Sequence, residues 1–275
     1  MRMYSTSLLG AKIDGGALSK TLFDLSGRVA VVLGGSSGLG KAISLGLAAH
    51  GADVVPGGRR IELIASICEE IRDLGRKTLE LPVDVSVRES VEEFREAVAK
   101  AFGRVDTLVN AAGVTFRKAT LDTSEDEWSG LFATNLEGVL HGCQVFYADL
   151  KSGGSGRIIN VASLGSYVAF QEVAAYCASK AAVLSLTRSL AIEWAEDNIC
   201  VNAIAPGVFP TELNSNLLSG TERGREILLR TPMKRFGEPN EVVGAAVLLA
   251  SEAASFITGQ CITVDGGFLA SGVNS

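Results

Sequence analysis

The sequence predicts a single α/β domain, in which a doubly wound parallel β-sheet of seven strands carries helices on both faces. Three observations lead to this fold class. Short runs rich in Val, Ile and Leu alternate with longer amphipathic stretches, a pattern typical of parallel strands joined by crossover helices. The first apolar run ends in a glycine-rich turn. Neither an internal repeat nor a linker-like stretch divides the 275 residues.

The first strand is expected at 28–35, where "RVAVVLGG" is a continuous β-branched run of the kind that is buried on both faces of a sheet. The second strand is expected at 52–58, and Pro56 marks the place where its pairing must weaken. The remaining strands are expected at 77–86, 105–113, 156–163, 199–207 and 260–267.

The stretches between these strands carry apolar residues at helical spacing. Helices are expected at 39–50, which Gly51 ends, and at 59–75, 87–103, 125–150 and 172–196. The domain is expected to span residues 23–275. Residues 1–22 lack the apolar stretch of a signal peptide and are expected to form an extension that precedes the fold.

Composition excludes several classes of function. The formal net charge of −6, without a cluster of Lys and Arg, argues against binding to nucleic acid. No apolar run is long enough to cross a membrane. Five cysteines without a paired motif favour free thiols in a reducing cytoplasm. Neither His50 nor His141 has companions that would make a metal site, so no metal is expected.

The segment "GGSSGLGK" at 34–41 joins the first strand to the first helix. Gly34, Gly38 and Gly40 allow a tight turn, the close approach of a diphosphate and dense packing of the helix on the strand. The helix N-terminus adds free N–H groups and the positive end of its dipole. Because this loop lies within a repeated β/α pattern, we expect it to bind the phosphates of a dinucleotide cofactor.

The end of the second strand is where dinucleotide-binding folds usually place an acidic residue for the adenosine ribose. Here Gly57 and Gly58 are followed by Arg59 and Arg60, while Asp53 precedes the apolar run. A guanidinium at this place suits the 2′-phosphate of NADP(H) through paired N–H bonds. We therefore expect NADP(H) to be favoured over NAD(H), with Arg59 as the reading residue. The alternative is that these arginines only cover the start of a helix.

The segment "AYCASK" at 175–180 holds two side chains whose chemistry can be coupled. Tyr176 and Lys180 are four residues apart, so they share one face of a helix. An ammonium group beside a phenol stabilises the phenolate, so Lys180 is expected to lower the pKa of Tyr176 toward the operating pH. Such a tyrosine can transfer a proton in catalysis. The alternative is an ordinary amphipathic helix face.

Taken together, the motifs resemble those of the short-chain dehydrogenase/reductase family. The segments "GGSSGLG", "NAAG" at 110–113, "NVAS" at 160–163, "YCASK" and "PG" at 206–207 occur in the family's order, and the resemblance covers the chain from Leu25 to Gly267. It implies a Rossmann-type domain, NAD(P)-dependent oxidation of alcohols or reduction of ketones, and a homotetramer.

The resemblance also implies roles for individual residues. Ser163 would hydrogen bond the reacting oxygen, and Tyr176 would transfer the proton. Lys180 would also hold the nicotinamide ribose, and Asn135 would hold a water molecule that completes a proton relay. The implied cofactor-binding residues are Gly34, Ser36, Ser37, Gly38, Leu39, Gly40, Arg59, Asp84, Val85, Asn110, Ala111, Gly113, Tyr176, Lys180, Pro206, Gly207, Val208 and Thr211.

The substrate is expected to be a small molecule. Segments 116–128 and 264–273 look most like gluconate 5-dehydrogenases and related sugar dehydrogenases, which implies a sugar acid or polyol. Arg117, on the carboxyl edge of the sheet, could hold a substrate carboxylate beside Ser163 and Tyr176, with Lys118 pointing elsewhere. A solvated loop charge or a subunit contact is the alternative for Arg117. The alternative functions are a 3-oxoacyl-[acyl-carrier-protein] reductase and a non-catalytic NADP(H)-binding sensor or scaffold.

Overall fold

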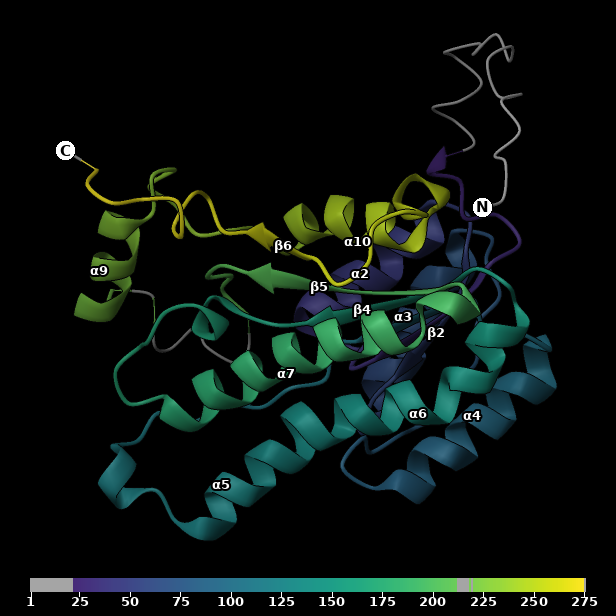
Figure 1. Ribbon diagram of the computed structural model, residues 1–275, viewed down its shortest axis with the longest axis horizontal. Helices are drawn as coiled ribbons and strands as arrows, with labels where there is room; N and C mark the ends of the chain where they lie inside the picture. The colour runs from purple at the N-terminus through teal and green to yellow at the C-terminus, as the bar shows by residue number, and fades with distance from the viewer. Residues whose placement is uncertain (1–21, 212–217, 219, 275) are drawn as a thin grey trace, which may run out of the picture.

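A six-stranded parallel β-sheet forms the centre of the part of the chain that this computed structural model describes, residues 22–211, 218 and 220–274 (Figure 1). The sheet has the order β2-β1-β3-β4-β5-β6. Its strands are β1 (Val29–Leu33), β2 (Asp53–Gly57), β3 (Thr107–Asn110), β4 (Gly156–Val161), β5 (Ile199–Pro206) and β6 (Cys261–Val264). The predicted Rossmann-type, doubly wound sheet is confirmed. Apart from Leu22, the extension expected over residues 1–22 lies outside the described residues.

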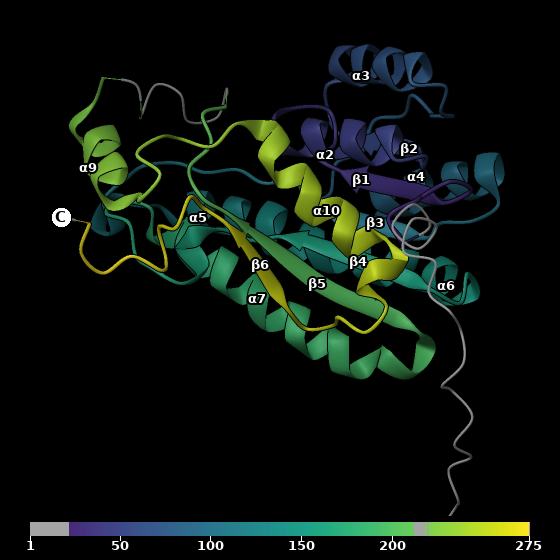
Figure 2. The same cartoon turned by 90° about the horizontal axis from the view of Figure 1, so that it is seen from above.

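Helices cover both faces of this sheet (Figures 1 and 2). One face carries α2 (Gly38–Ala49), α3 (Ile61–Asp73) and α10 (Val243–Ala250), and the other carries α4 (Arg88–Phe102), α6 (Gly138–Ser152) and α7 (Ala174–Glu193). Helix α5 (Glu125–Phe132) leads into α6, and α9 (Glu222–Arg230) lies beyond the carboxyl ends of β5 and β6. Single 3₁₀ turns are η1 (Thr120–Asp122), η3 (Leu164–Ser166), η4 (Ala195–Asp197), η5 (Pro239–Val242) and η6 (Glu252–Ala254).

The core consists of two apolar layers, one on each face of the sheet. Ile43 and Leu47 of α2 pack with β1 on one face, while Phe94 of α4 and Phe146 of α6 pack on the other. All five residues of β1 are buried. Full burial of one such side chain contributes about 1.5–3 kcal/mol relative to leaving it exposed. A strand covered on both faces therefore needs the continuous apolar run that the sequence shows.

The prediction of seven strands is wrong, because residues 77–86 form no ladder with the sheet. Two backbone hydrogen bonds join this segment to the edge of β2, from Val54 N–H to the Lys77 carbonyl at 3.1 Å and from Val83 N–H to the carbonyl of Gly58 at 2.7 Å. Between those two bonds lies Pro56, on the same edge of β2. Since proline has no N–H to donate, the ladder is interrupted there.

The helix expected over 125–150 is divided by a π-helical segment, Ala133–Glu137, between α5 and α6. π-Helical segments within α-helices are rare in proteins. Where they do occur, they are frequently found at functional sites. Asn135 lies in the middle of the segment and is 0% exposed. The π-helical segment therefore turns a polar side chain into the protein interior.

The order of the strands places a crevice at the carboxyl ends of β1 and β3. From β1 the chain winds outward to β2 and then returns to β3 on the opposite side of β1. In open α/β sheets, ligands bind where the winding direction changes in this way. The glycine-rich loop after β1 and the loop after β3 meet at this place, since Ala111 N–H donates to the Leu33 carbonyl at 2.8 Å.

Candidate active site

Two glycines of the loop after β1 are required by packing. Gly34 has a φ of 85°, and a Cβ at this position would lie 2.4 Å from the backbone nitrogen of Ala112. A Cβ at Gly40 would lie 2.0 Å from the carbonyl oxygen of Gly34. Any larger residue would push α2 away from the end of β1 and from the loop after β3. These glycines therefore bring the helix N-terminus to the crevice.

The third glycine leaves room for a ligand. Gly38 has a φ of 53°, and the nearest atom to a Cβ there would be the methyl carbon of Thr211, at 3.6 Å. Ser37 is the N-cap of α2, but its side chain accepts no capping hydrogen bond, and the first turn holds no acidic residue. The N-terminus of α2 thus fits the diphosphate of a dinucleotide cofactor. Ser36 is buried beside this turn, and Leu39 packs against the core.

The two arginines that follow β2 have different partners. Arg60 Nη2 donates to Ser37 Oγ in the glycine-rich loop at 3.0 Å. Arg59 is 66% exposed, and its Nη1 lies 4.0 Å from Asp84 Oδ2. A Cβ on Gly58 would lie 2.7 Å from Ser36 Oγ, which explains why no larger residue stands there. Arg60, which directly follows the predicted Arg59 and was not itself predicted, is therefore the arginine that contacts the glycine-rich loop.

Asp84 and Val85 lie at the outer side of the crevice. The carboxylate of Asp84 accepts hydrogen bonds from the N–H and the hydroxyl of Ser86, at 3.0 and 2.6 Å. Burial alone would raise the pKa of Asp84, but these bonds and the charge of Arg59 together lower it. Val85 packs beneath Gly138 of α6, where a Cβ would approach Val85 Cγ2 to 2.7 Å. Asp84 thus stays charged at neutral pH beside Arg59.

Asn110 at the end of β3 takes part in a buried network. Its Nδ2 donates to Asn160 Oδ1 at 2.8 Å, and Asn160 Nδ2 donates in turn to Thr187 Oγ1 at 2.9 Å. Asn110 is 3% exposed, and its Oδ1 has no partner. The side chain therefore ties the end of β3, where the loop 111–113 begins, to β4 and, through Asn160, to α7. Within that loop, a Cβ at Gly113 would lie 3.5 Å from Lys180 Nζ.

Ser163, Tyr176 and Lys180 come together at the carboxyl end of β4. Ser163 caps the 3₁₀ turn η3, its Oγ accepting the N–H of Gly165 at 3.1 Å, and its side chain lies close enough to the Tyr176 phenol to lower the pKa of that group. The first turns of α7 carry Tyr176 and Lys180, and Lys180 Nζ lies 5.9 Å from the centre of the Tyr176 ring. The predicted grouping of these three residues is present in the structure.

The predicted effect of Lys180 on Tyr176 is wrong. Burial raises the pKa of Tyr176, and the nearby side chain of Ser163 opposes this only in part. Lys180 is 4% exposed, and its Nζ donates to the Val161 carbonyl at 2.8 Å rather than to the phenol. Burial lowers the pKa of Lys180 to about 8. The tyrosine is thus held protonated, while the lysine can release its proton near neutral pH.

Asn135 braces the loop after β3. Its Oδ1 accepts the N–H of Val114 at 2.8 Å, and its Nδ2 donates to the Val114 carbonyl at 3.0 Å and to Ser179 Oγ at 3.2 Å. Ser179 Oγ donates in turn to the carbonyl of Tyr176 at 2.8 Å. The π-helical segment therefore joins the crevice loop to the helix that carries Tyr176, a structural connection that the sequence did not reveal.

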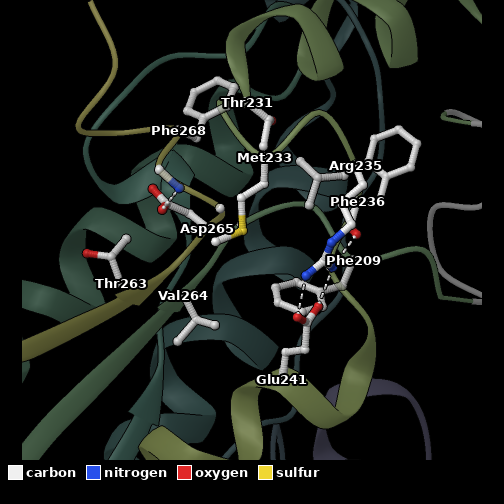
Figure 3. A pocket seen from close by; sticks show the side chains of 15 residues that line it. Phe209, Thr231, Met233, Arg235, Phe236, Glu241, Thr263, Val264, Asp265 and Phe268 are labelled. Carbon is white, nitrogen blue, oxygen red and sulfur yellow. Dashed lines mark hydrogen bonds and ion pairs between the residues drawn. The ribbon is translucent and has the colours of Figure 1, made fainter.

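The loop after β5 closes the crevice on the other side with Pro206, Gly207, Val208 and Thr211. A Cβ at Gly207 would lie 2.7 Å from Asp265 Cα, so β5 and the chain after β6 are in close contact. A cavity of about 340 Å³ lies beside this loop. Figure 3 shows Phe209, Met233 and Phe268 among the side chains that line it. Its lining includes Gly207 and Val208 of this loop but not Ser163, Tyr176 or Lys180.

Arg117 lies beside the site but is paired. Its Nε donates to Glu172 Oε2 at 2.5 Å, and Glu172 precedes α7. Lys118 points away, as predicted, because its Nζ donates to both carboxylate oxygens of Glu127 at 2.8 and 2.9 Å. Among the described residues, no group of three or more His, Cys, Asp or Glu side chains is arranged to hold a metal ion.

Comparison with known proteins identifies the family. A family model described as enoyl-(acyl carrier protein) reductase, adh_short_C2, matches residues 34–269. The chain belongs to the short-chain dehydrogenase/reductase family. It is therefore an NAD(P)-dependent oxidoreductase. In the part of the chain that the structure describes, we find no helix with the length and apolar character needed to cross a membrane.

Several similar proteins are named for gluconate-type molecules or glycerol. A 2-dehydro-3-deoxy-D-gluconate 5-dehydrogenase of Dickeya dadantii is 40% identical over 249 residues, 90% of this chain and 98% of that protein. An NAD-dependent glycerol dehydrogenase of Listeria innocua is 38% identical over 90% of this chain and 95% of its own. The crystal structure of a gluconate 5-dehydrogenase from Burkholderia cenocepacia, in complex with NADP and tartrate, superposes with a TM-score of 0.89 at 35% identity, over 92% of this chain and 100% of that chain.

Proposed function

We propose that this enzyme interconverts a secondary alcohol and a ketone on a sugar acid or polyol, with Ser163, Tyr176 and Lys180 as catalytic residues. One observation carries the proposal: Tyr176 and Lys180 lie on the same face of α7, with Lys180 Nζ 5.9 Å from the centre of the Tyr176 ring, and Ser163 lies close enough to the phenol to lower its pKa. The names of the relatives, which refer to gluconate-type molecules and glycerol, support the substrate class.

The side chains account for the movement of one proton. In ketone reduction, Ser163 orients the carbonyl oxygen and Tyr176 donates its phenolic proton to that oxygen. The raised pKa of Tyr176 keeps it protonated at neutral pH, as a proton donor must be. Lys180, with a pKa of about 8, returns a proton to Tyr176 through water held at Asn135. The nicotinamide cofactor supplies the hydride when bound, and alcohol oxidation follows the reverse course.

The crevice between β1 and β3 is the proposed cofactor site. Residues Ser36–Gly40 and the N-terminus of α2 would bind the diphosphate. Asp84, Val85 and the loop 110–113 would surround the adenosine. Residues 206–208 and Thr211 would bind the nicotinamide, and Lys180 its ribose. The open turn at Gly38 supports this assignment, because a side chain there would occupy the space between α2 and Thr211.

Reduced NADP is expected to bind more tightly than reduced NAD. Arg60→Ala should remove most of this preference, and Arg59→Ala a smaller part, because Arg60 contacts the glycine-rich loop while Arg59 is exposed beside Asp84. A charge-assisted contact contributes about 1.5–3 kcal/mol, which corresponds to a ten- to hundredfold difference in affinity. Fluorescence titration with both cofactors measures this difference in affinity. Arg72→Ala, at the other end of α3, is the control and should keep the preference of the wild type. Equal affinities of the wild type for the two cofactors would contradict the proposal.

The substrate class is tested by measuring turnover on three kinds of compound. The panel comprises a sugar acid such as D-gluconate, its neutral counterpart D-glucitol, and a 3-oxoacyl thioester for the alternative reductase function. We expect the highest kcat/KM on the sugar acid. Fastest turnover of the thioester would instead favour the acyl-carrier-protein reductase, and binding of cofactor without any turnover would favour a sensor or scaffold.

A homotetramer is the proposed assembly. Large apolar side chains are exposed on α5, on α7 and beside β6, where Trp128 is 40%, Ile192 80% and Phe256 fully exposed. A second copy could cover such surfaces. Light scattering should give about four times the 28.7 kDa of one chain, and a monomer at micromolar concentration would contradict the tetramer.

A reducing cytoplasm is the proposed location, which the five free cysteines support.

A further inference from the structure

Arg223 on α9 reaches toward the segment that precedes α7. Its Nη1 donates to the carbonyl of Gln171 at 3.1 Å, and its guanidinium lies 6.0 Å from the ring centre of Phe170. The carbonyl is a neutral partner. Within the described ranges, Arg223 forms no ion pair within 4.0 Å, whereas the nearby Arg225 pairs with Glu222. Its charge is therefore not neutralised by direct contact with a described carboxylate.

Arg223 shares its surroundings with Arg117 and Glu172. Burial and the charge of Arg117 lower the pKa of the Arg223 guanidinium, while Glu172 opposes this change. Glu226 opposes it as well, so two arginines and two glutamates form a cluster without net formal charge, in which Glu172 pairs with Arg117. Cys177 is also within electrostatic range of Arg223 and directly follows Tyr176 in the sequence, so the cluster lies near the first turn of α7. A substrate carboxylate that displaced the side chain of Glu172 from Arg117 would leave this balance of charge unchanged.

A hydrogen bond from Lys118 fixes the backbone of Glu172, and the Glu172 side chain extends to Arg117. Its φ of 64° is in the left-handed region, which few residues other than glycine adopt. Its carbonyl accepts the N–H of Lys118 at 2.8 Å, which fixes this conformation to the loop after β3. The carboxylate accepts one of the five N–H donors of Arg117 and is about one-third exposed. A second carboxylate could replace it without movement of the backbone.

We propose that Arg223 and Arg117 together form a subsite for the carboxylate of the substrate, which the side chain of Glu172 occupies when no substrate is bound. This inference rests on the proposed sugar-acid function. A carboxylate held between two guanidinium groups gains charge-assisted hydrogen bonds from both. It would fix one end of the hydroxy acid, and so place the carbon to be oxidised near Ser163 and Tyr176. Arg223 is thus a specificity-determining residue, and Glu172 is an internal competitor.

Binding is measured by calorimetry on the cofactor-saturated protein, with D-gluconate and the neutral D-glucitol as probes. Arg223→Gln should raise the Kd for gluconate about ten- to a hundredfold and leave that for glucitol within twofold. Arg223→Lys should restore part of the affinity, because the charge remains. Glu172→Gln should tighten gluconate binding several-fold, because the competing charge is gone. Arg225→Gln, on the same helix but 76% exposed and paired with Glu222, should change neither Kd.

Equal losses on both probes in Arg223→Gln would overturn the subsite, as would a wild type that binds gluconate no better than glucitol. If Arg223→Gln fails to fold, the gluconate affinities of Arg223→Lys and Glu172→Gln test the subsite instead. Weaker gluconate binding in Glu172→Gln would show that Glu172 positions Arg117 and does not compete with the substrate. The proposed function is tested separately by turnover. Gluconate that binds through Arg223 but is not oxidised would refute the sugar-acid dehydrogenase and leave the carboxylate subsite standing.

Discussion

Tyr176→Phe should lower turnover at least about a hundredfold while leaving cofactor affinity unchanged. The phenol lies close to the side chain of Ser163, and a positioned acid contributes about 10²–10⁴-fold to rate. Phenylalanine keeps the ring and removes only the oxygen, so the packing at the start of α7 is preserved. Steady-state kinetics on the best substrate of the panel, with a parallel cofactor titration, measures both effects.

Tyr147→Phe is the matched control for this variant. Tyr147 donates to Asp197 at 2.5 Å, just beyond the far end of α7 from Tyr176. The 20 residues of that helix span about 30 Å. Because this hydrogen bond lies so far from Tyr176, its loss in Tyr147→Phe should reduce stability slightly and leave turnover unchanged. Wild-type turnover in Tyr176→Phe would remove the catalytic assignment and would favour the alternative of a binding protein without activity.

Lys180→Met should reduce turnover by a similar factor and also change how stability depends on pH. The pKa of Lys180 is about 8 in the folded chain against an ordinary value of 10.5, because burial disfavours the ammonium. Between these two values the unfolded chain binds more protons than the folded chain. The wild type therefore gains stability as pH rises from 8 to 10.5. Methionine has no proton to exchange, so the variant lacks this gain.

Chemical denaturation of both proteins at several pH values tests this difference. The free energy of unfolding of Lys180→Met, taken relative to the wild type, should decrease between pH 8 and pH 10.5 and remain constant below pH 7. A relative stability that does not change across this range would show that the pKa of Lys180 is not lowered. Lys41→Met is a suitable control, since Lys41 is exposed and pairs with Glu70 on the surface.

The sequence alone determined the alternation of strands and helices, the glycine-rich loop and the grouping of Tyr176 with Lys180. These features depend on interactions between residues close in the chain. Two side chains four positions apart must share a face of any α-helix. A continuous apolar run ending in glycine leaves few structures other than a buried strand followed by a turn. Such features can be predicted without knowing what the rest of the chain does.

Contacts between distant segments were decided only by the tertiary structure. Residues 77–86 are β-like in sequence, but they lie against the edge of β2 on which Pro56 offers no N–H. Which arginine meets Ser37 depends on where α3 begins, and Arg117 meets a carboxylate 55 positions away. The Lys180 ammonium turns to a carbonyl of β4, and the burial that raises the pKa of Tyr176 comes from several elements together. Burial and long-range electrostatics are properties of the assembled fold, so no local pattern could have specified them.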